Sequence, residues 1–111
     1  MSADPVVTGE ETGVLRLDEE LMIYQVAQTW SLIDDAFKRE AQAGQQSDLR
    51  LDCRALREID GAGFQLLWLA ARHLAGLGAR LRLIGLGDAL RGQLQVLDAA
   101  GLFVHESAEA A

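Results

Sequence analysis

The spacing of apolar and polar residues changes several times along this chain, and each change predicts a new element of secondary structure. Residues 49–53 alternate apolar and polar, which is the period of a half-buried strand. From Ala62 to Leu77 long apolar residues recur at helical spacing without a proline, so we expect a helix there. Residues 54–60 are predicted to be a linker that leads into the small turn Ile59-Asp60-Gly61-Ala62-Gly63.

The spacing of apolar and polar residues also predicts the elements on either side of this segment. Short strands are expected at residues 14–17, 21–23, 79–84 and 102–104. A first helix is expected from Tyr24, and its core-facing stripe is predicted to be Val26, Trp30, Ile33, Phe37 and Ala41. A third helix, with Asp88 expected as its cap, should bury Leu90, Leu94 and Leu97.

This order of elements predicts an α/β fold class. We expect a single compact domain over residues 13–105, with a mixed, mostly parallel sheet of four to five short strands and three to four helices. The first strand is expected to run antiparallel, because no long crossover separates it from the second. Residues 1–12 are predicted to be a flexible acidic tail, and residues 106–111 a flexible C-terminal tail.

Composition narrows the classes of function. The 111 residues carry a formal net charge of −7, which argues against nucleic acid and anionic lipid as partners. No apolar run approaches the roughly 20 residues of a membrane span, and the N-terminus does not resemble a secretory signal. We therefore expect a cytoplasmic protein without direct membrane insertion.

No catalytic or metal-binding constellation stands out. His73 and His105 are far apart in the sequence, and Cys53 is the only cysteine and is expected to be a small core residue. The serines lack a paired base. The sequence therefore predicts a protein that is not an enzyme and has no metal and no cofactor.

The turn and the helix that follows it are the most informative segment. Asp60 is expected to cap the helix, alone or while also contacting a partner. Residues 61–63 could cradle an anion at the helix N-terminus, but close packing of the helix against a strand is favoured because Asp60 would repel an anion. At about 100° per residue, the side opposite the apolar arc or beside it carries Gln65, Trp68, Leu69 and Arg72.

At these residues the chain resembles a STAS domain, the family of anti-sigma-factor antagonists and of sulfate-transporter C-terminal domains. The resemblance spans roughly residues 14–104, and is carried by residues 21–24, 51–63, 78–85 and 97–102. In the phospho-switched antagonists of this family the turn resembles Asp-Ser-Ser-Gly or Asp-Ser-Thr-Gly. Asp60 and Gly63 match that pattern, but the hydroxyl positions are Gly61 and Ala62, which cannot accept a phosphoryl group.

The resemblance implies a protein-interaction module that binds through this turn and helix. The expected partner-binding residues are Asp60, Gly61, Ala62, Gly63, Gln65, Trp68, Leu69 and Arg72. An anti-sigma factor or a histidine-kinase-type signalling protein is the first expected partner. The alternatives are the ATPase of an ABC lipid transporter, with this chain as its STAS subunit, and a small ligand or nucleotide. Self-association into a homodimer stays open.

Overall fold

The protein is built on a four-stranded parallel sheet. The computed structural model describes residues 14–44 and 47–108 of the chain. The strands are β1 (Val14–Arg16), β3 (Leu49–Asp52), β5 (Leu81–Ile84) and β6 (Phe103–Glu106), and they lie in that order across the sheet. Every pairing within it is parallel. The α/β fold class predicted from the sequence is therefore confirmed.

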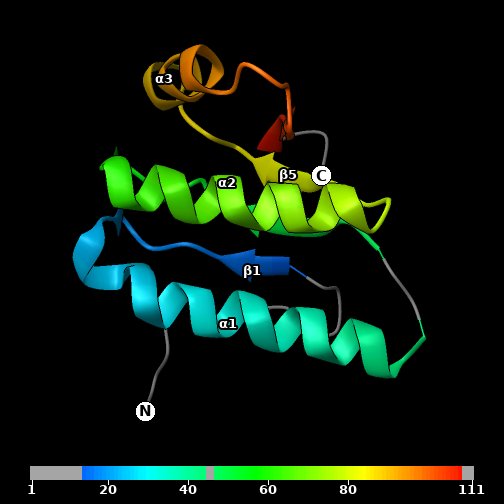
Figure 1. Cartoon of the computed structure of the whole chain (residues 1–111). Coiled ribbons are helices and arrows are strands. Elements are labelled where there is room, and N and C mark those ends of the chain that lie inside the picture. The colour runs from blue at the N-terminus through cyan, green and yellow to red at the C-terminus, as the bar shows by residue number, and fades with distance from the viewer. Residues whose placement is uncertain (1–13, 45–46, 109–111) are drawn as a thin grey trace.

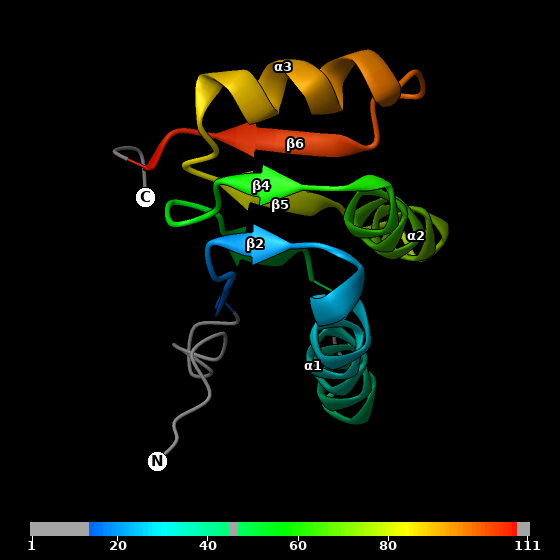
Figure 2. The ribbon, with the colours of Figure 1, turned by 90° about the vertical axis from the view of Figure 1, so that its left-hand side faces the viewer.

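Two long helices cover one face of this sheet and a shorter helix lies beside one edge strand. Figure 1 shows α1 (Ile23–Gln42) and α2 (Gly61–Gly76) side by side across the sheet. In Figure 2, α3 (Asp88–Leu97) runs alongside β6. Each helix lies on a crossover between parallel strands, which is why it can pack back onto the sheet.

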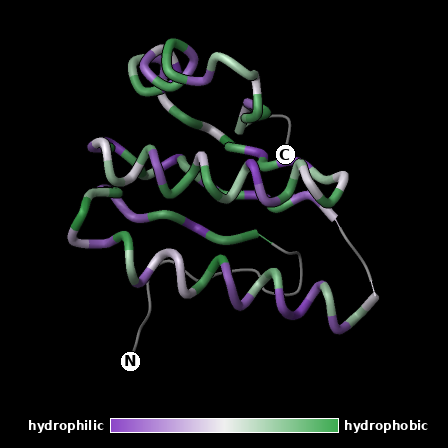
Figure 3. The backbone as a smooth tube through the Cα atoms, viewed as in Figure 1, coloured by the Kyte–Doolittle hydropathy of each residue, from purple (hydrophilic) through white to green (hydrophobic). Residues whose placement is uncertain are grey.

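The core lies between the sheet and the two long helices. The largest fully buried side chains are mostly leucines, and the set consists of Leu21, Ile33, Leu51, Leu67, Leu74, Leu81, Leu83 and Cys53. Hydrophilic positions recur along α1, as Figure 3 shows, because only one side of this helix faces the core. Helix α2 is more deeply embedded, with six buried residues.

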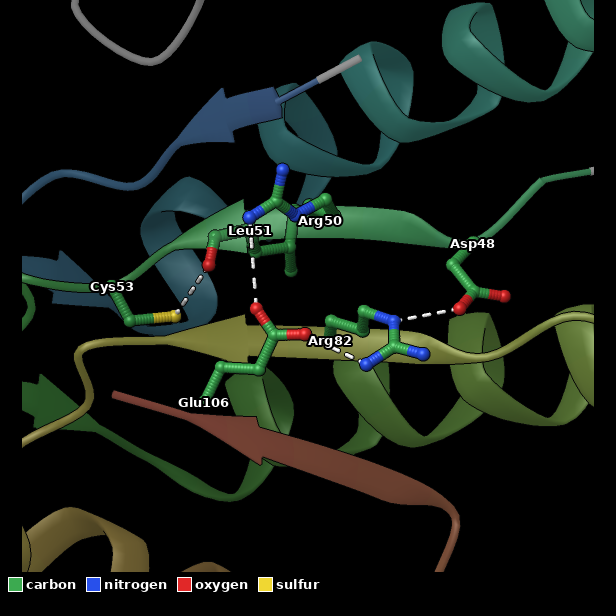
Figure 4. Close-up of polar contacts among 6 residues, drawn as sticks. All are labelled: Asp48, Arg50, Leu51, Cys53, Arg82 and Glu106. Carbon is green, nitrogen blue, oxygen red and sulfur yellow. Dashed lines mark hydrogen bonds and ion pairs between the residues drawn. The ribbon is translucent and has the colours of Figure 1, made fainter. Parts of the chain in front are cut away.

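The opposite face of the sheet is held by charged side chains. Arg82 lies between two carboxylates, with Nε 2.6 Å from Asp48 and Nη1 2.7 Å from Glu106 (Figure 4). Arg50 on the neighbouring strand lies 3.6 Å from the same Glu106 carboxylate. These ion pairs join β3, β5 and β6 across a face that α1 and α2 do not cover.

A second, smaller ladder leads into both long helices. The strands β2 (Glu20–Leu21) and β4 (Glu58–Ile59) pair in parallel, with Glu20 beside Glu58 and Leu21 beside Ile59. Residues 54–60 were predicted to be a linker only, but they also contain the strand β4. The predicted strand at residues 21–23 is displaced, since Ile23 already belongs to α1.

The direction predicted for the first strand is wrong. Strand β1 pairs with β3 in parallel, with Leu15 beside Leu51. The short strand β2 does not pair with β1, because it pairs with β4 outside the main sheet. The connection from β1 to its sheet neighbour therefore contains α1, which is long enough for a parallel crossover.

Two predicted helical stripes are only partly correct. In α1, Ile33 is buried together with Thr29 and Ala36, while Trp30 and Ala41 are exposed. In α3, Leu90 and Leu94 are buried, but Leu97 is 56% exposed at the end of the helix. In α1 the buried stripe is turned toward Thr29 and Ala36, which leaves Trp30 at its margin, and in α3 the buried stripe stops before Leu97, where the helix ends.

Asp88 and Glu106 also differ from their predicted roles. Gly87 is the N-cap residue of α3, without a side-chain cap, while Asp88 is the first helical residue and its Oδ1 lies 2.6 Å from Nη2 of Arg91. Glu106, predicted to begin a flexible tail, is the last residue of β6, where it pairs with Ile84. The predicted tail at residues 1–12 lies outside the described residues.

Candidate functional site

The carboxylate of Asp60 joins the beginnings of the two long helices. Its Oδ1 accepts a 2.8 Å hydrogen bond from the N–H of Gly63, which confirms the predicted cap of α2. Its Oδ2 accepts a 2.9 Å hydrogen bond from the N–H of Ile23, the first residue of α1. The hydrogen bond from Gly63, and to a lesser extent the one from Ile23, lowers the pKa of the Asp60 carboxyl below its ordinary value. The sequence predicted the first bond but not the second.

The two glycines of the turn serve different purposes. A Cβ on Gly63 would overlap the backbone carbonyl oxygen of Leu21 in β2, and it would also crowd the side chain of Ile59. A Cβ on Gly61 would meet no other atom of the described residues within 4 Å. Gly63 therefore permits close packing of α2 against a strand, which was the favoured prediction. Gly61 is exposed, and because it has no side chain the backbone of the turn is accessible there.

The outward side of α2 carries the remaining predicted residues. Gln65 and Arg72 are exposed, and Leu69 is 51% exposed although it lies in the middle of the helix. Trp68 is half-buried against the core, and the guanidinium carbon of Arg72 lies 4.8 Å from the centre of its ring. Arg72 and Trp68 thus form a cation–π pair on the helix surface, with Leu69 uncovered beside them. Ala62 is half-buried in the first turn.

The structure adds exposed apolar residues that sequence reasoning did not single out. Tyr24 and Ile23, in the first turn of α1, are 88% and 64% exposed. Val96 near the end of α3 is 83% exposed, next to the exposed Leu97. The sequence offered no signal for this exposure, because Leu66 and Leu67 are also an adjacent apolar pair in one helical turn and both are buried.

These residues flank the turn on two sides. Ile23 is hydrogen-bonded to Asp60 on the α1 side. On the other side, a groove of about 610 Å³ runs between α2 and α3, and its lining residues are Ile59, Asp60, Gly61, Phe64, Gln65, Gln93, Leu94, Val96 and Leu97. Figure 2 shows the face on which β2, β4 and the first turns of α1 and α2 meet.

The other reactive side chains are held in structural positions. Cys53 is buried as predicted, its Sγ donates to the carbonyl oxygen of Leu51, and burial raises the pKa of the thiol to about 12. His73 stacks on Phe37, with ring centroids 4.7 Å apart. Within residues 14–44 and 47–108, no group of three or more His, Cys, Asp and Glu side chains could hold a metal ion. In the same ranges no helix is long and apolar enough to cross a membrane.

The family of the chain follows from comparison with known sequences. A family model described as "Mlab, STAS domain" matches residues 6–105, which is nearly the whole chain. The protein therefore belongs to the STAS domain family, and the resemblance seen in the sequence is confirmed. A search of curated proteins finds no match.

Solved structures show the same fold. The chain is similar to the unphosphorylated anti-sigma factor antagonist SpoIIAA, with 24% identity, a TM-score of 0.59 and coverage of 74% of this chain and 71% of that one. The phosphorylated form of the Bacillus cell fate determinant SpoIIAA gives 22% identity, a TM-score of 0.60 and coverage of 83% and 79%. A Thermotoga maritima protein assigned as an anti-sigma factor antagonist gives 12% identity, a TM-score of 0.67 and coverage of 86% and 80%.

Proposed function

We propose that this STAS domain is a non-enzymatic module that binds a regulatory protein, such as an anti-sigma factor or a histidine-kinase-type signalling protein. The observation that carries the proposal is the outward side of α2. Leu69 is half exposed beside the Arg72–Trp68 pair, in the middle of the helix that Asp60 caps. Apolar, aromatic and arginine side chains gathered on one surface are typical of binding interfaces.

In this proposal binding is not controlled by phosphorylation of the turn. Residues 58–65 contain no serine, threonine or tyrosine, so phosphorylation by a kinase cannot change the charge at the beginning of α2. The low pKa of Asp60 keeps its carboxylate ionised at neutral pH. A partner would therefore meet the same turn at all times, and the amounts of the two proteins would control the complex.

Substitutions on this surface test the proposal. A partner captured from the native host by the full chain is identified by mass spectrometry, which also separates a signalling protein from a transporter ATPase. We expect Leu69→Asp, Arg72→Glu and Ala62→Asp each to weaken that complex at least about tenfold, or about 1.4 kcal/mol. A carboxylate in place of Leu69 or of the half-buried Ala62 would have to be desolvated against the partner, and Arg72→Glu removes the cation–π contact with Trp68.

The matched controls lie at the far ends of α1 and α2. Leu77→Asp makes the same chemical change at a residue that is 46% exposed at the C-cap of α2. Arg39→Glu reverses an exposed charge in the last turn of α1. Both controls should keep the affinity within about twofold. Normal binding by all three site variants would place the interface elsewhere.

A further inference from the structure

The apolar surface on both sides of Asp60 needs an occupant that is itself apolar. Ile23 and Tyr24 stand on the α1 side, and Phe64, Val96 and Leu97 line the groove on the α3 side. Asp60 connects the two sides, because its carboxylate accepts a hydrogen bond from the N–H of Ile23 and the residue also lines the groove. Exposed apolar side chains grouped in this way are a mark of an interaction surface.

The edge of this surface is acidic. In the β2–β4 ladder the exposed residues Glu20 and Glu58 are direct cross-strand neighbours, an arrangement of like charges that is unfavourable in a free sheet. Neither carboxylate pairs with another side chain in the described ranges. A positive charge from outside the chain would remove their mutual repulsion.

We propose that the partner docks through a segment whose apolar side chains are flanked by lysine or arginine. The apolar side chains lie on Ile23 and Tyr24 and in the groove between α2 and α3, and the cations lie against Glu20 and Glu58. This inference rests on the proposed function, and it adds the chemistry of the partner and two surfaces beyond α2.

The same charges argue against other occupants. A second copy of this chain would bring its own Glu20, Glu58 and Asp60 to the same face, and both copies carry a net charge of −7. An anionic segment would be repelled in the same way. Charge complementarity therefore favours a basic, amphipathic segment of another protein.

A defined peptide tests this chemistry before the partner is known. The probe is a synthetic helical peptide with leucine on one face and lysine on the other, and its analogue carries glutamate in place of lysine. Binding to the full-length protein is measured by fluorescence anisotropy at about 50 and about 300 mM salt. The key variant is Glu20→Gln with Glu58→Gln. Its control, Asp35→Asn with Asp88→Asn, makes the same change in net charge on exposed residues of α1 and α3.

We expect the lysine peptide to bind and the glutamate analogue not to bind. The Glu20→Gln/Glu58→Gln protein should bind at least roughly fivefold more weakly while its thermal midpoint stays the same or rises, because a repulsive pair is removed. The control should stay within about twofold. Tyr24→Ser and Val96→Ser should each weaken binding, since both side chains are more than four-fifths exposed and neither is part of the core.

Equal losses in the two double variants would show attraction by net charge alone and would overturn the inference, as would equal binding of both peptides or no binding. Unchanged binding by Tyr24→Ser and Val96→Ser would overturn the apolar part. These results are separable from failure of the proposed function. If the captured partner still loses affinity with Leu69→Asp, the binding surface on α2 stands and only the chemistry assigned to the partner is wrong.

Discussion

His105 is a single residue at which the fold and pH are coupled. It lies in β6 beside Leu83 in the register, and both of its ring nitrogens are buried without a hydrogen-bond partner among the described residues. Phe103 packs edge-on against its ring at 6.4 Å. Burial and then the positive charge of Arg91 lower the pKa of His105, while Asp98 acts in the opposite direction. The folded protein therefore favours the neutral imidazole over its protonated form.

A pH-dependent loss of stability follows from this residue. Because the pKa is lower in the folded state than the unfolded value of about 6.5, the unfolded chain binds the proton more readily. Stability from this group is complete above that value and is lost as the pH falls through the folded pKa. We expect urea unfolding at about pH 7.5 and about pH 5.5 to show a smaller loss for His105→Leu than for the natural protein. Equal losses would mean that His105 does not titrate differently on unfolding.

At the scale of elements, the contact between α2 and β2 depends on one glycine. Gly63 lies directly against the backbone carbonyl of Leu21, while Asp60 ties the same end of α2 to α1. The two contacts together fix the position of the turn relative to β2 and α1. The relative positions of Ile23, Asp60 and the groove depend on them.

A pair of glycine substitutions separates packing from helix propensity. Gly63→Ala should destabilise the protein by about 1–3 kcal/mol, because α2 and β2 must move apart to admit a methyl group. Gly61→Ala should leave stability unchanged or raise it by up to about 1 kcal/mol, since its methyl group would meet no other atom of the described residues within 4 Å and alanine favours the helix. Chemical denaturation measures both. Similar effects of the two substitutions would contradict the assigned role of Gly63.

The elements differ in how far the sequence could predict them. The helix from residue 62 and the strands at residues 49–53 and 79–84 repeat one period over several residues, so their pattern is strong. Strand β4 has only two residues and no period to detect. Glu106 looked like part of a charged tail because its partners, Arg82 and Arg50, are distant in the sequence.

The candidate site, too, could be predicted from the sequence only in part. The cap by Asp60 and the outward position of Leu69 follow from helical geometry, so the sequence was sufficient for both. The bond from Ile23 to Asp60 joins residues 37 positions apart, and the groove needs α3 to lie beside α2. Contacts of that kind depend on the tertiary arrangement, which no local pattern contains.

For the molecule as a whole, we expect a module without a phosphorylation switch at its central turn. A cognate Ser/Thr kinase should add no phosphate to residues 58–65, because none of them carries a hydroxyl group. Intact-mass measurement followed by peptide mapping checks this. Phosphate on Ser31 or Ser47 would indicate a different means of control, and phosphate within residues 58–65 would contradict the prediction.

An amide chemical-shift map of the labelled protein with its captured partner tests most directly whether the partner binds the outward side of α2. We expect the largest changes on Gly61, Gln65 and Leu69, because these residues would lie within the interface. Changes confined to Arg50 and Arg82, on the sheet face that α1 and α2 do not cover, with α2 unaffected, would contradict this expectation.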